Sequence, residues 1–530
     1  MKGRREHKKR RDPPRAAPPA PPAAPLSGEF TTREKLLCAA VLLLLYTVLA
    51  TWGQFDFSEF MGYYNLLADG FLDGHLYIRA RPDQGTVYDM VPYQGRYYLQ
   101  WGPWPGILHM APKLAGWILT DRVACLLAGW LTSLVFFGII LRLRRSYFPD
   151  VPKWVAASFL AAFALATPTP VVTFHATIYH ESIVIANLFV LLAWLGFLHY
   201  LEEPSAGGAA WAGFALCLAA TTRISLALYA AGLVGGAAAL GHWRRQPGRT
   251  RLAHLAAVTI PILLGGGTMM AYNYARFGSP WEYGLKYMRP DHRPYAWNRI
   301  PENFRHYVLA PVRFSRDSPW VLHTGWPPLV RTDRAEDVSS LLLGSPFLLL
   351  GALAWRHFRK DQPAPAPLRI FLAALCGSGL LVFLSLLCFD AASRRYTHDF
   401  IPEFLILAFA GVGAAGSATP WRRWRPVAAV VLTASVLLHL HLSFFQFVGG
   451  GPDANAMKTF LWMSPVLRRL APSQKLEDQV AITHNDVGVM YLMQGRTADA
   501  LRHFEQAAEA MPHSDRIQKN LRLARGLMGR

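Results

Sequence analysis

The sequence predicts an all-α protein in which about eleven membrane-spanning helices precede a small helical unit at the C-terminal end. Of its 530 residues, 52% are hydrophobic and only 17% are charged. Many apolar runs approach or exceed the ~20 residues that a helix needs to cross a bilayer. A repeat-like pattern late in the chain predicts the helical unit. This composition excludes a disordered chain, a collagen and a disulfide-rich secreted scaffold.

The charge balance is strongly basic, with 54 Lys and Arg against 34 Asp and Glu, a formal net charge of +20. Nucleic-acid binding would need these cations on one soluble face. They instead punctuate the apolar runs, which favours a multi-pass membrane protein that follows the positive-inside rule. Residues 1–34, which begin MKGRREHKKRRDPPR, predict a disordered basic arm in the cytoplasm, against anionic lipid, rather than a cleaved signal peptide.

Eleven apolar runs predict the spans of a membrane domain at 35–447. They lie near 35–53, 121–141, 154–171, 183–200, 208–220, 223–240, 253–273, 338–355, 368–388, 400–418 and 426–447. The run at 104–119 is also apolar, but it carries Pro105, His109, Pro112 and Lys113. We expect an interfacial or re-entrant helix there, because another span would invert every later loop and break the charge pattern.

The loops set the predicted orientation. With the N-terminus in the cytoplasm, the strongly basic clusters near 142–153, 244–251, 356–360 and 422–425 all fall on the cytoplasmic side. The exception is HYLEEPSAGG near 199–208. An odd number of spans puts the C-terminal end outside. Two long outer loops follow, at about 54–120 and 274–337, and loops of this length are usually functional. A bacterial inner membrane fits this organisation best.

The tail at 448–530 is expected to be soluble and outside. Counting from Ala481, seven residues fall at tetratricopeptide positions: Gly488, Tyr491, Gly495, Ala500, Phe504, Ala507 and Pro512. This predicts one repeat at about 481–514 with a further helix at 515–525. One repeat cannot bury a core alone, so we expect it to pack on the membrane domain, on a helix near 457–470 or on a second copy. It is also a candidate surface for a protein partner.

Motifs for metals and nucleotides are absent from the sequence. The five cysteines lie inside apolar runs without CxxC spacing, which predicts neither zinc nor disulfides. The sequence has no Walker loop, dinucleotide fingerprint, nucleophile elbow or HExxH.

The first outer loop begins with two carboxylates, Asp56 and Glu59, three residues apart and on one helical face. A carboxylate at the mouth of a span is costly to desolvate unless it is used or paired. One interpretation is a general base facing a membrane-embedded substrate. The alternative is a helix cap, with Asp56 or Ser58 starting an amphipathic helix.

Aromatic and ionisable residues follow in GRYYLQWGPWPG, with Tyr97 and Trp101, and in TIYHES, with His180 and Glu181. The aromatic segment predicts either a wall that binds sugar or lipid, or an interfacial belt. The His-Glu pair could contact a ligand or a metal, or could pair with loop arginines.

Cations stand at predicted outer positions where the positive-inside rule does not expect them. Arg223 could bind phosphate or snorkel to lipid head groups. Arg276 and Lys286 flank Glu282 at the start of the second long loop. Arg394 and Arg395 suggest an anionic partner, and Asp399 could neutralise one of them.

In their order and predicted sidedness, these segments resemble the GT-C superfamily of polytopic membrane glycosyltransferases. The closest branch is the protein-mannosyltransferase and aminoarabinose-transferase type. The resemblance covers about 35–447 and rests on the acidic first loop, GRYYLQWGPWPG, the YHES and TTR steps, NYARFGSPWEYG and RRYTHDFIP. It implies transfer of a sugar from a polyprenyl-phosphate donor to an acceptor hydroxyl on the outer face.

The resemblance also implies roles for individual residues. The base falls on Asp56 by position, with Glu59 next, although many members carry adjacent acids where this chain has Asp-Phe-Ser-Glu. The departing phosphate gains negative charge, so cations should await it. The implied donor-phosphate residues are Arg223, Arg276, Lys286 and Arg395, and the implied sugar or acceptor residues are His180, Glu181, Tyr97, Trp101 and Asp399. No cofactor is expected, although a divalent metal is possible in this superfamily.

Two other functions fit parts of the sequence. A flippase or transporter for a lipid-linked sugar would place ionisable residues near the bilayer midplane, often in inverted repeats, whereas here they cluster at one face. A membrane scaffold would use the repeat to recruit partners, but it would need neither eleven spans nor two aromatic outer loops.

Overall fold

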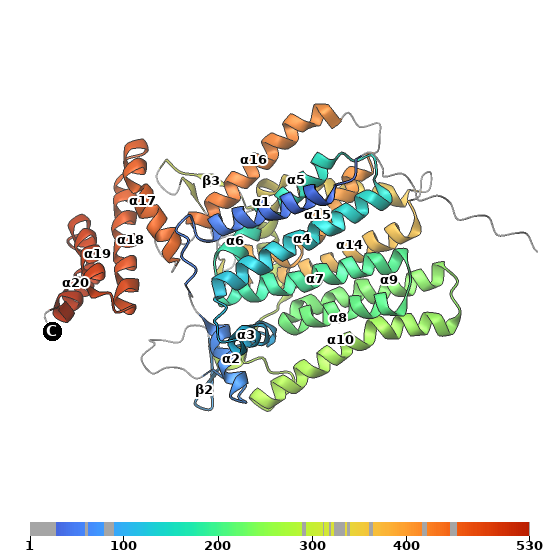
Figure 1. The fold of residues 1–530 in the computed structure, drawn as a ribbon, viewed down its shortest axis with the longest axis horizontal. Helices are drawn as coiled ribbons and strands as arrows, with labels where there is room; N and C mark the ends of the chain where they lie inside the picture. Colours follow the sequence, from blue (N-terminus) through green and yellow to red (C-terminus); the bar gives the residue numbers. More distant parts are fainter. Residues whose placement is uncertain are drawn as a thin grey trace, which may run out of the picture.

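The computed structural model describes residues 28–58, 62–78, 90–288, 293–310, 312–316, 320–322, 334–335, 340–359, 364–415, 421–445 and 453–528. Helices dominate this part of the chain (Figure 1). Its strands form three short pairs: β1 (Val91–Tyr93) with β2 (Arg96–Tyr98), β3 (Arg313–Phe314) with β4 (Val321–Leu322), and β5 (Arg334–Ala335) with β6 (Ala391–Ala392). The predicted all-α class is confirmed.

Each of the eleven predicted runs contains helical structure. The helical segments are α1 (Thr32–Ala50), α4 (Asp121–Tyr147), α5 (Lys153–Leu165), α6 (Thr169–Phe174), α7 (Ile178–Glu202), α8 (Ala206–Thr222), η1 (Ile224–Tyr229), α9 (Ala230–Trp243), α10 (Gly248–Phe277), α13 (Leu341–Gly344), η4 (Pro346–Phe358), α14 (Ala366–Leu387), α15 (Ile401–Gly413) and α16 (Trp421–Phe445). Among the described residues, six helical stretches are long and apolar enough to cross a membrane: α4, α7, η1 with α9, α10, α14 and α16. The number of spans stays a prediction.

The predicted span at 154–171 is interrupted. Helix α5 ends at Leu165 and α6 starts at Thr169. Pro168 and Pro170 lack the amide hydrogens that a continuous helix would need there, so the helix breaks at this point. The freed polar groups are partly satisfied by Thr167, whose hydroxyl donates to the Phe163 carbonyl at 2.7 Å.

The remaining elements lie in the loops and at the C-terminal end. The first long loop holds α2 (Tyr63–Leu72), β1, β2 and α3 (Trp104–Leu114). The second holds α11 (Leu285–Met288), η2 (Trp297–Arg299), α12 (Ile300–Phe304), η3 (Arg305–Leu309) and strands β3 to β5. Segment η5 (Arg394–Asp399) follows β6, and the C-terminal unit contains α17 (Ala454–Leu470), α18 (Gln474–Met493), α19 (Thr497–Ala510) and α20 (Asp515–Met528). Helix α3 has 11 residues, about half the length that a span needs.

Glycines let neighbouring helices of the membrane part approach closely. A Cβ on Gly213 of α8 would collide with the Val258 carbonyl of α10. In the same way, a Cβ on Gly411 of α15 would collide with the Leu350 carbonyl of η4. Small residues at helix contacts are typical of membrane bundles, where close packing replaces the hydrophobic driving force.

One end of the bundle, which we name the basic end, carries the basic turns near 142–153, 243–251, 355–359 and 421–425 (Figure 1). The turn that breaks the charge pattern also lies here: Arg142 pairs with Glu202 at 2.6 Å. Arg244 also reaches this turn, because its guanidinium donates to the Glu202 carbonyl at 3.1 Å. Arginine side chains stack on tryptophans at this end, as in Arg244 over Trp243 at 5.9 Å. Such aromatic and basic belts are typical of a membrane–water interface.

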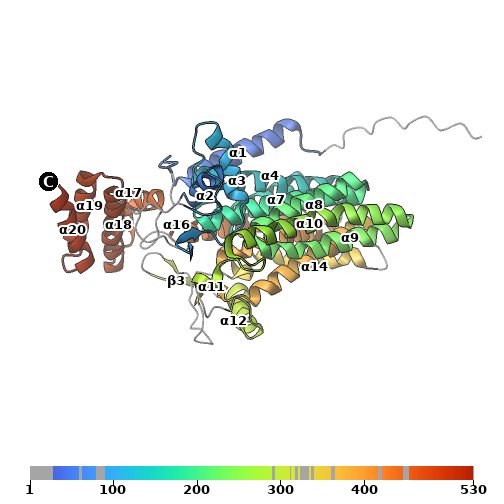
Figure 2. The same cartoon turned by 90° about the horizontal axis from the view of Figure 1, so that it is seen from below.

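The opposite end, which we name the loop end, carries α2, α3 and the C-terminal unit (Figures 1 and 2). Helix α17 packs beside the ends of α1 and α16, where Phe444, Phe460 and Leu476 form a buried cluster with Trp52 against it. Helix α1 therefore connects the two ends, because its start at the basic end pairs Glu34 with Lys153 at 2.8 Å.

In the C-terminal unit, α17 is followed by a helical hairpin of α18 and α19 and then by α20. Gly488 of α18 lies directly against the Phe504 ring of α19, and Gly495 turns the chain with φ +74°. Leu521 and Ala524 of α20 complete the buried face. Small residues stand where the two helices cross, at positions that the repeat pattern predicts, while assignment to the repeat family stays a prediction.

Candidate functional site

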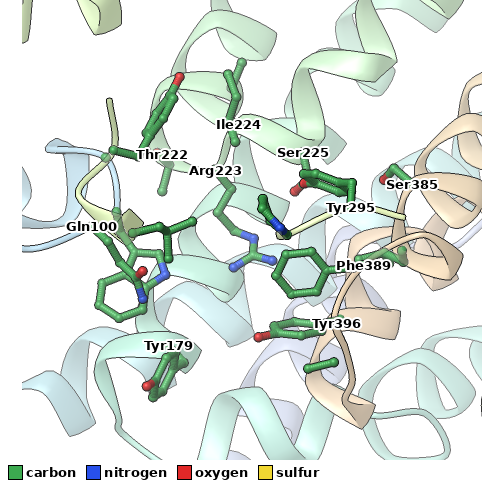
Figure 3. A pocket seen from close by; sticks show the side chains of 18 of the residues that line it. Gln100, Tyr179, Thr222, Arg223, Ile224, Ser225, Tyr295, Ser385, Phe389 and Tyr396 are labelled. Atoms are coloured by element: carbon green, nitrogen blue, oxygen red, sulfur yellow. The ribbon is translucent and has the colours of Figure 1, made fainter. Parts of the chain in front are cut away.

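A cavity of about 660 Å³ lies at the loop end, between the ends of α8, η1, α10 and α14 and the segment η5. Figure 3 shows the Arg223 guanidinium near its centre, with Phe389 and Tyr396 on one side and Gln100 and Tyr179 on the other. The walls come from both long loops and from the turn between α14 and α15. Residues far apart in the sequence therefore share one site.

Arg223 reaches the cavity because α8 ends just before it. Its backbone is extended, with φ −140° and ψ 115°, which turns the side chain away from the helix axis. One guanidinium nitrogen lies 2.8 Å from the Asp399 Oδ2. The Ser225 hydroxyl donates to the same carboxylate oxygen at 3.2 Å. Asp399 is therefore an orienting partner that holds Arg223 in place.

Arg395 lines the same cavity from η5. Its guanidinium lies 4.2 Å from the centre of the Tyr179 ring and 5.3 Å from that of Tyr396. Trp101 packs edge-on against Tyr179 at 5.0 Å. Arg223 and Arg395 thus give the cavity two guanidinium groups on aromatic walls, an arrangement suited to an anion with several acceptor oxygens.

The WGPWPG segment is fastened directly to the end of α8. The Gly102 amide donates to the Thr222 carbonyl at 3.2 Å, and the Trp104 ring nitrogen donates to the Thr221 hydroxyl at 2.7 Å. A Cβ on Gly102 would overlap the Thr221 carbonyl oxygen. This close approach explains the glycine and brings Trp101 to the cavity wall.

The other side of the cavity is apolar. Ile224, Leu228, Met269 and Leu386 line it. Ile224 is 52% exposed and Leu228 is 37% exposed, so this side faces outward from the bundle. The cavity therefore combines a cationic interior with an apolar side, which suits an amphiphile with an anionic head.

Among the described residues, two carboxylates belong to the cavity region. Asp390 lines the cavity, whereas Asp399 is fully buried and bound to Arg223. In the described part of the chain, no three His, Cys, Asp or Glu side chains are grouped as metal ligands.

His180 and Glu181 do not line the cavity. Both are buried, and the His180 Nδ1 lies 2.9 Å from the Thr177 hydroxyl. The Glu181 Oε1 lies 2.6 Å from the His109 Nε2, a pair only 1% exposed on each side. The Asn65 Oδ1 faces the other ring nitrogen of His109 at 3.1 Å. This network joins α2, α3 and α7, so Glu181 holds the first loop on the bundle.

Asp56 lies at the junction with the C-terminal unit and is not among the residues that line the cavity. Its Oδ1 accepts a hydrogen bond from the Ser58 amide at 3.0 Å, and its Oδ2 lies 3.5 Å from the Lys458 ammonium. Burial raises the pKa of Asp56, but the contacts from Ser58 and Lys458 outweigh it and hold the pKa below its usual range. Glu59, the other predicted base, lies outside the described residues.

The remaining predicted residues lie away from the cavity. Arg276 is buried, donates to the Leu99 carbonyl and binds the Asn273 amide oxygen at 2.6 Å, so it ties the first loop to α10. Lys286 pairs with Glu282 at 2.9 Å, and this hydrogen bond raises the pKa of Lys286. Tyr97 packs in the small apolar cluster beneath α2.

Comparisons with known proteins give structural neighbours only. The chain is similar to ArnT from Cupriavidus metallidurans bound to undecaprenyl phosphate, with a TM-score of 0.42 and 16% sequence identity over 93% of this chain and 77% of that chain. It is similar to the apo state of the same protein, with a TM-score of 0.40 and 16% identity over 92% and 75% of the two chains. No protein-family model and no curated protein matches the chain.

Sequence reasoning missed several residues of the cavity. Tyr179 stands in the YHES segment directly before His180, and Tyr396 stands in the RRYTHD segment directly after Arg395. The sequence motifs pointed to the ionisable neighbours and not to these two tyrosines. Their position beside a selected arginine was the available signal. Tyr295 and Asp390 line the cavity from loop segments that carry no motif.

Proposed function

We propose that the protein is a membrane glycosyltransferase that moves a sugar from a polyprenyl-phosphate donor to an acceptor hydroxyl at the outer face of a bacterial inner membrane. The observation that carries this proposal is the cavity with two guanidinium groups, Arg223 and Arg395, beside an exposed apolar side. A donor of this kind has an anionic phosphate and a long apolar chain. Both halves find matching chemistry at one place.

The proposed binding mode follows from this match. The phosphate accepts hydrogen bonds from Arg223 and Arg395, and the chain leaves past Ile224 and Leu228 toward lipid. Tyr179 and Trp101 offer aromatic surface for the sugar ring. Asp399 keeps Arg223 aligned, which lowers the entropy lost on binding. Arg276 and Lys286 support the loops instead of binding the phosphate.

The proposed reaction breaks the bond between the anomeric carbon and the phosphate oxygen. A new bond forms between that carbon and the acceptor oxygen. The acceptor proton passes to a carboxylate, and the leaving phosphate keeps the electron pair while the two arginines stabilise its growing charge. We propose Asp56 as the base. Glu59, from the same loop, is one alternative, and Asp390, which lines the cavity, is another.

The decisive experiment measures consumption of labelled polyprenyl-phosphate sugars by the full-length protein in detergent, with lipid, peptide and polysaccharide acceptors. Wild type should consume one donor and release polyprenyl phosphate. Of the variants Asp56→Asn, Glu59→Gln and Asp390→Asn, the one that removes the base should abolish turnover while the protein stays folded. Transport of an intact lipid-linked sugar across proteoliposomes, without bond cleavage, would replace this proposal with a flippase.

The arginines give a second prediction. Arg395→Leu and Arg223→Leu should each raise the KM for the donor roughly 10- to 100-fold, because each removes charge-assisted hydrogen bonds to the phosphate. Lys286→Met tests the phosphate-binding role that the sequence predicts for Lys286. If Lys286 bound the phosphate, this variant would show the same increase in donor KM. Because Lys286 instead pairs with Glu282, we expect a much smaller increase. Equal donor KM in wild type and in both arginine variants would contradict the proposed phosphate site.

A further inference from the structure

Helix α17 of the C-terminal unit contacts the segment that carries Asp56. The Asn455 side-chain amide donates to the Asp56 carbonyl at 2.8 Å, and the Lys458 ammonium lies 3.5 Å from the Asp56 carboxylate. The Thr459 hydroxyl donates to the Trp52 carbonyl at 2.7 Å and accepts a hydrogen bond from the Gln54 side chain at 3.0 Å. The contacts fall on both the backbone and the side chain of Asp56.

The contacted segment needs outside support because its backbone is strained. Trp52 and Phe55 both have left-handed backbones, with φ +47° and φ +53°. Large residues adopt this conformation at a cost and keep it only where surrounding contacts impose it. Helix α17 supplies such contacts on one side, and on the other the hydroxyl of Thr120, the N-cap residue of α4, donates to the Phe57 carbonyl at 2.8 Å.

A buried ionic anchor fixes the start of α17. Asp453, only 4% exposed, caps the helix by accepting from the amides of Asn455 and Ala456 at 2.9 and 3.2 Å. Its other oxygen lies 3.2 Å from the His175 Nδ1 and 3.5 Å from an Arg122 nitrogen. The same Arg122 nitrogen donates to a carbonyl at the end of α1 at 2.9 Å. The anchor therefore fixes the start of α17 relative to the end of α1.

We infer that α17 helps to build the surroundings of Asp56 in the first long loop, and that Asn455 and Lys458 are positioning residues for the Asp56 carboxylate. This inference rests on the proposed function, because it assigns them to the proposed base. Asn455 holds the backbone of Asp56 and Lys458 holds its side chain, while Asp453 fixes the helix from which both project. The C-terminal unit is thus needed to shape the site, in addition to any partner that it binds.

The inference makes a prediction about pH. Removing the Lys458 charge raises the pKa of Asp56. If turnover needs ionised Asp56, the acid limb of the pH–rate profile then shifts to higher pH. Other titratable groups around this junction are engaged elsewhere: Arg122 and His175 face Asp453, and the Asp121 carboxylate accepts from the Gly62 amide. Tyr491 and His503 of the C-terminal hairpin also lie near Lys458. Within the described part of the chain, Lys458 is the cation that pairs with Asp56.

The first test records donor turnover against pH in the full-length protein in detergent. In Lys458→Met we expect the acid limb to move up by about half a pH unit. Lys458→Arg should restore it, and Lys475→Met, which removes an exposed lysine of α18, should leave it at the wild-type position. Asn455→Ala should lower kcat about tenfold with an unchanged donor KM, because it misplaces the base and not the donor. An acid limb that stays in place in Lys458→Met, with turnover dependent on Asp56, overturns the inference and leaves the proposed function intact.

The second test does not need activity. Hydrogen exchange of peptides that cover residues 50–58 should be faster in Asn455→Ala than in wild type and Lys475→Met, with the rest of the bundle unchanged. If wild type consumes no donor, the proposed function fails, and this exchange result alone decides whether α17 holds the segment. Equal exchange in all three proteins overturns the positioning role.

Discussion

The basic end and the loop end of the bundle use charge in opposite ways. At the basic end, Arg142 and Glu202 pair with 30% and 15% of their side chains exposed. At the loop end, Arg223 and Asp399 pair with 11% and 0% exposed. Exposed ion pairs contribute little because water and salt screen them. Buried charges must be paired, and breaking such a pair is costly.

The sequence distance between partners differs as well. Arg142 and Glu202 are 60 residues apart, on consecutive turns of the same end, whereas Arg223 and Asp399 are 176 apart. The charges of the basic end are those that the positive-inside rule counts, and the orientation that they imply for the chain stays a prediction. The loop end uses individual charges to join distant segments into a site. Substitutions at the two ends should therefore differ in cost.

The largest loss should come from the buried pair that holds the first loop. His109→Leu leaves the Glu181 carboxylate buried without its 2.6 Å partner, and removing one member of a buried pair costs about 3–5 kcal/mol. The free energy of unfolding, measured in mixed detergent, should fall by that order. The double variant His109→Leu/Glu181→Leu should recover part of the loss, because neither buried polar group then remains. If the double variant is no more stable than His109→Leu, the broken His109–Glu181 pair is not the source of the stability loss.

A smaller loss is expected where Gly102 meets α8. In Gly102→Ala the new methyl group would overlap the Thr221 carbonyl, which is backbone and can move only with its helix. We expect a destabilisation of roughly 2–3 kcal/mol, as for overpacked cores, together with a raised donor KM because Trp101 moves. Gly138→Ala in α4 is the matched control: its Cβ would meet nothing within 4 Å, and a helical Gly→Ala change gains about 0.5–1 kcal/mol. Equal stability of the two alanine variants would mean that the WGPWPG segment does not rest on α8.

Much of the fold follows from the sequence because it depends on composition over long stretches. Apolar runs of sufficient length give helices, and the charges between them indicate which turns share an end. The break at Pro168 and Pro170 shows where this reading fails: the run stays apolar across the break, and only the missing amide hydrogens reveal it.

The candidate site was only partly predictable because a charge in a sequence does not name its partner. The sequence predicts Arg223, Arg395 and Trp101 as site residues, and all three line the cavity. Arg276 was selected for the same reason, yet it binds the Leu99 carbonyl in the first loop. The partner of Asp56, Lys458, comes about 400 residues later, from the helix that precedes the predicted repeat. Such pairings depend on which surfaces meet, and local pattern does not record that.

The smallest effect is expected at the basic end, and it tests the comparison from the other side. Arg142→Ala removes the partner of Glu202, but both groups remain accessible to water. The free energy of unfolding should fall by less than about 1 kcal/mol, and the difference from wild type should shrink further as salt is raised, since screening weakens the pair in the parent protein. A loss as large as that of His109→Leu, insensitive to salt, would mean that this pair behaves as a buried one. Burial would then no longer explain why ion pairs at the two ends differ in their contribution to stability. The structural role of the loop-end charges would have to be argued from the segments that they join.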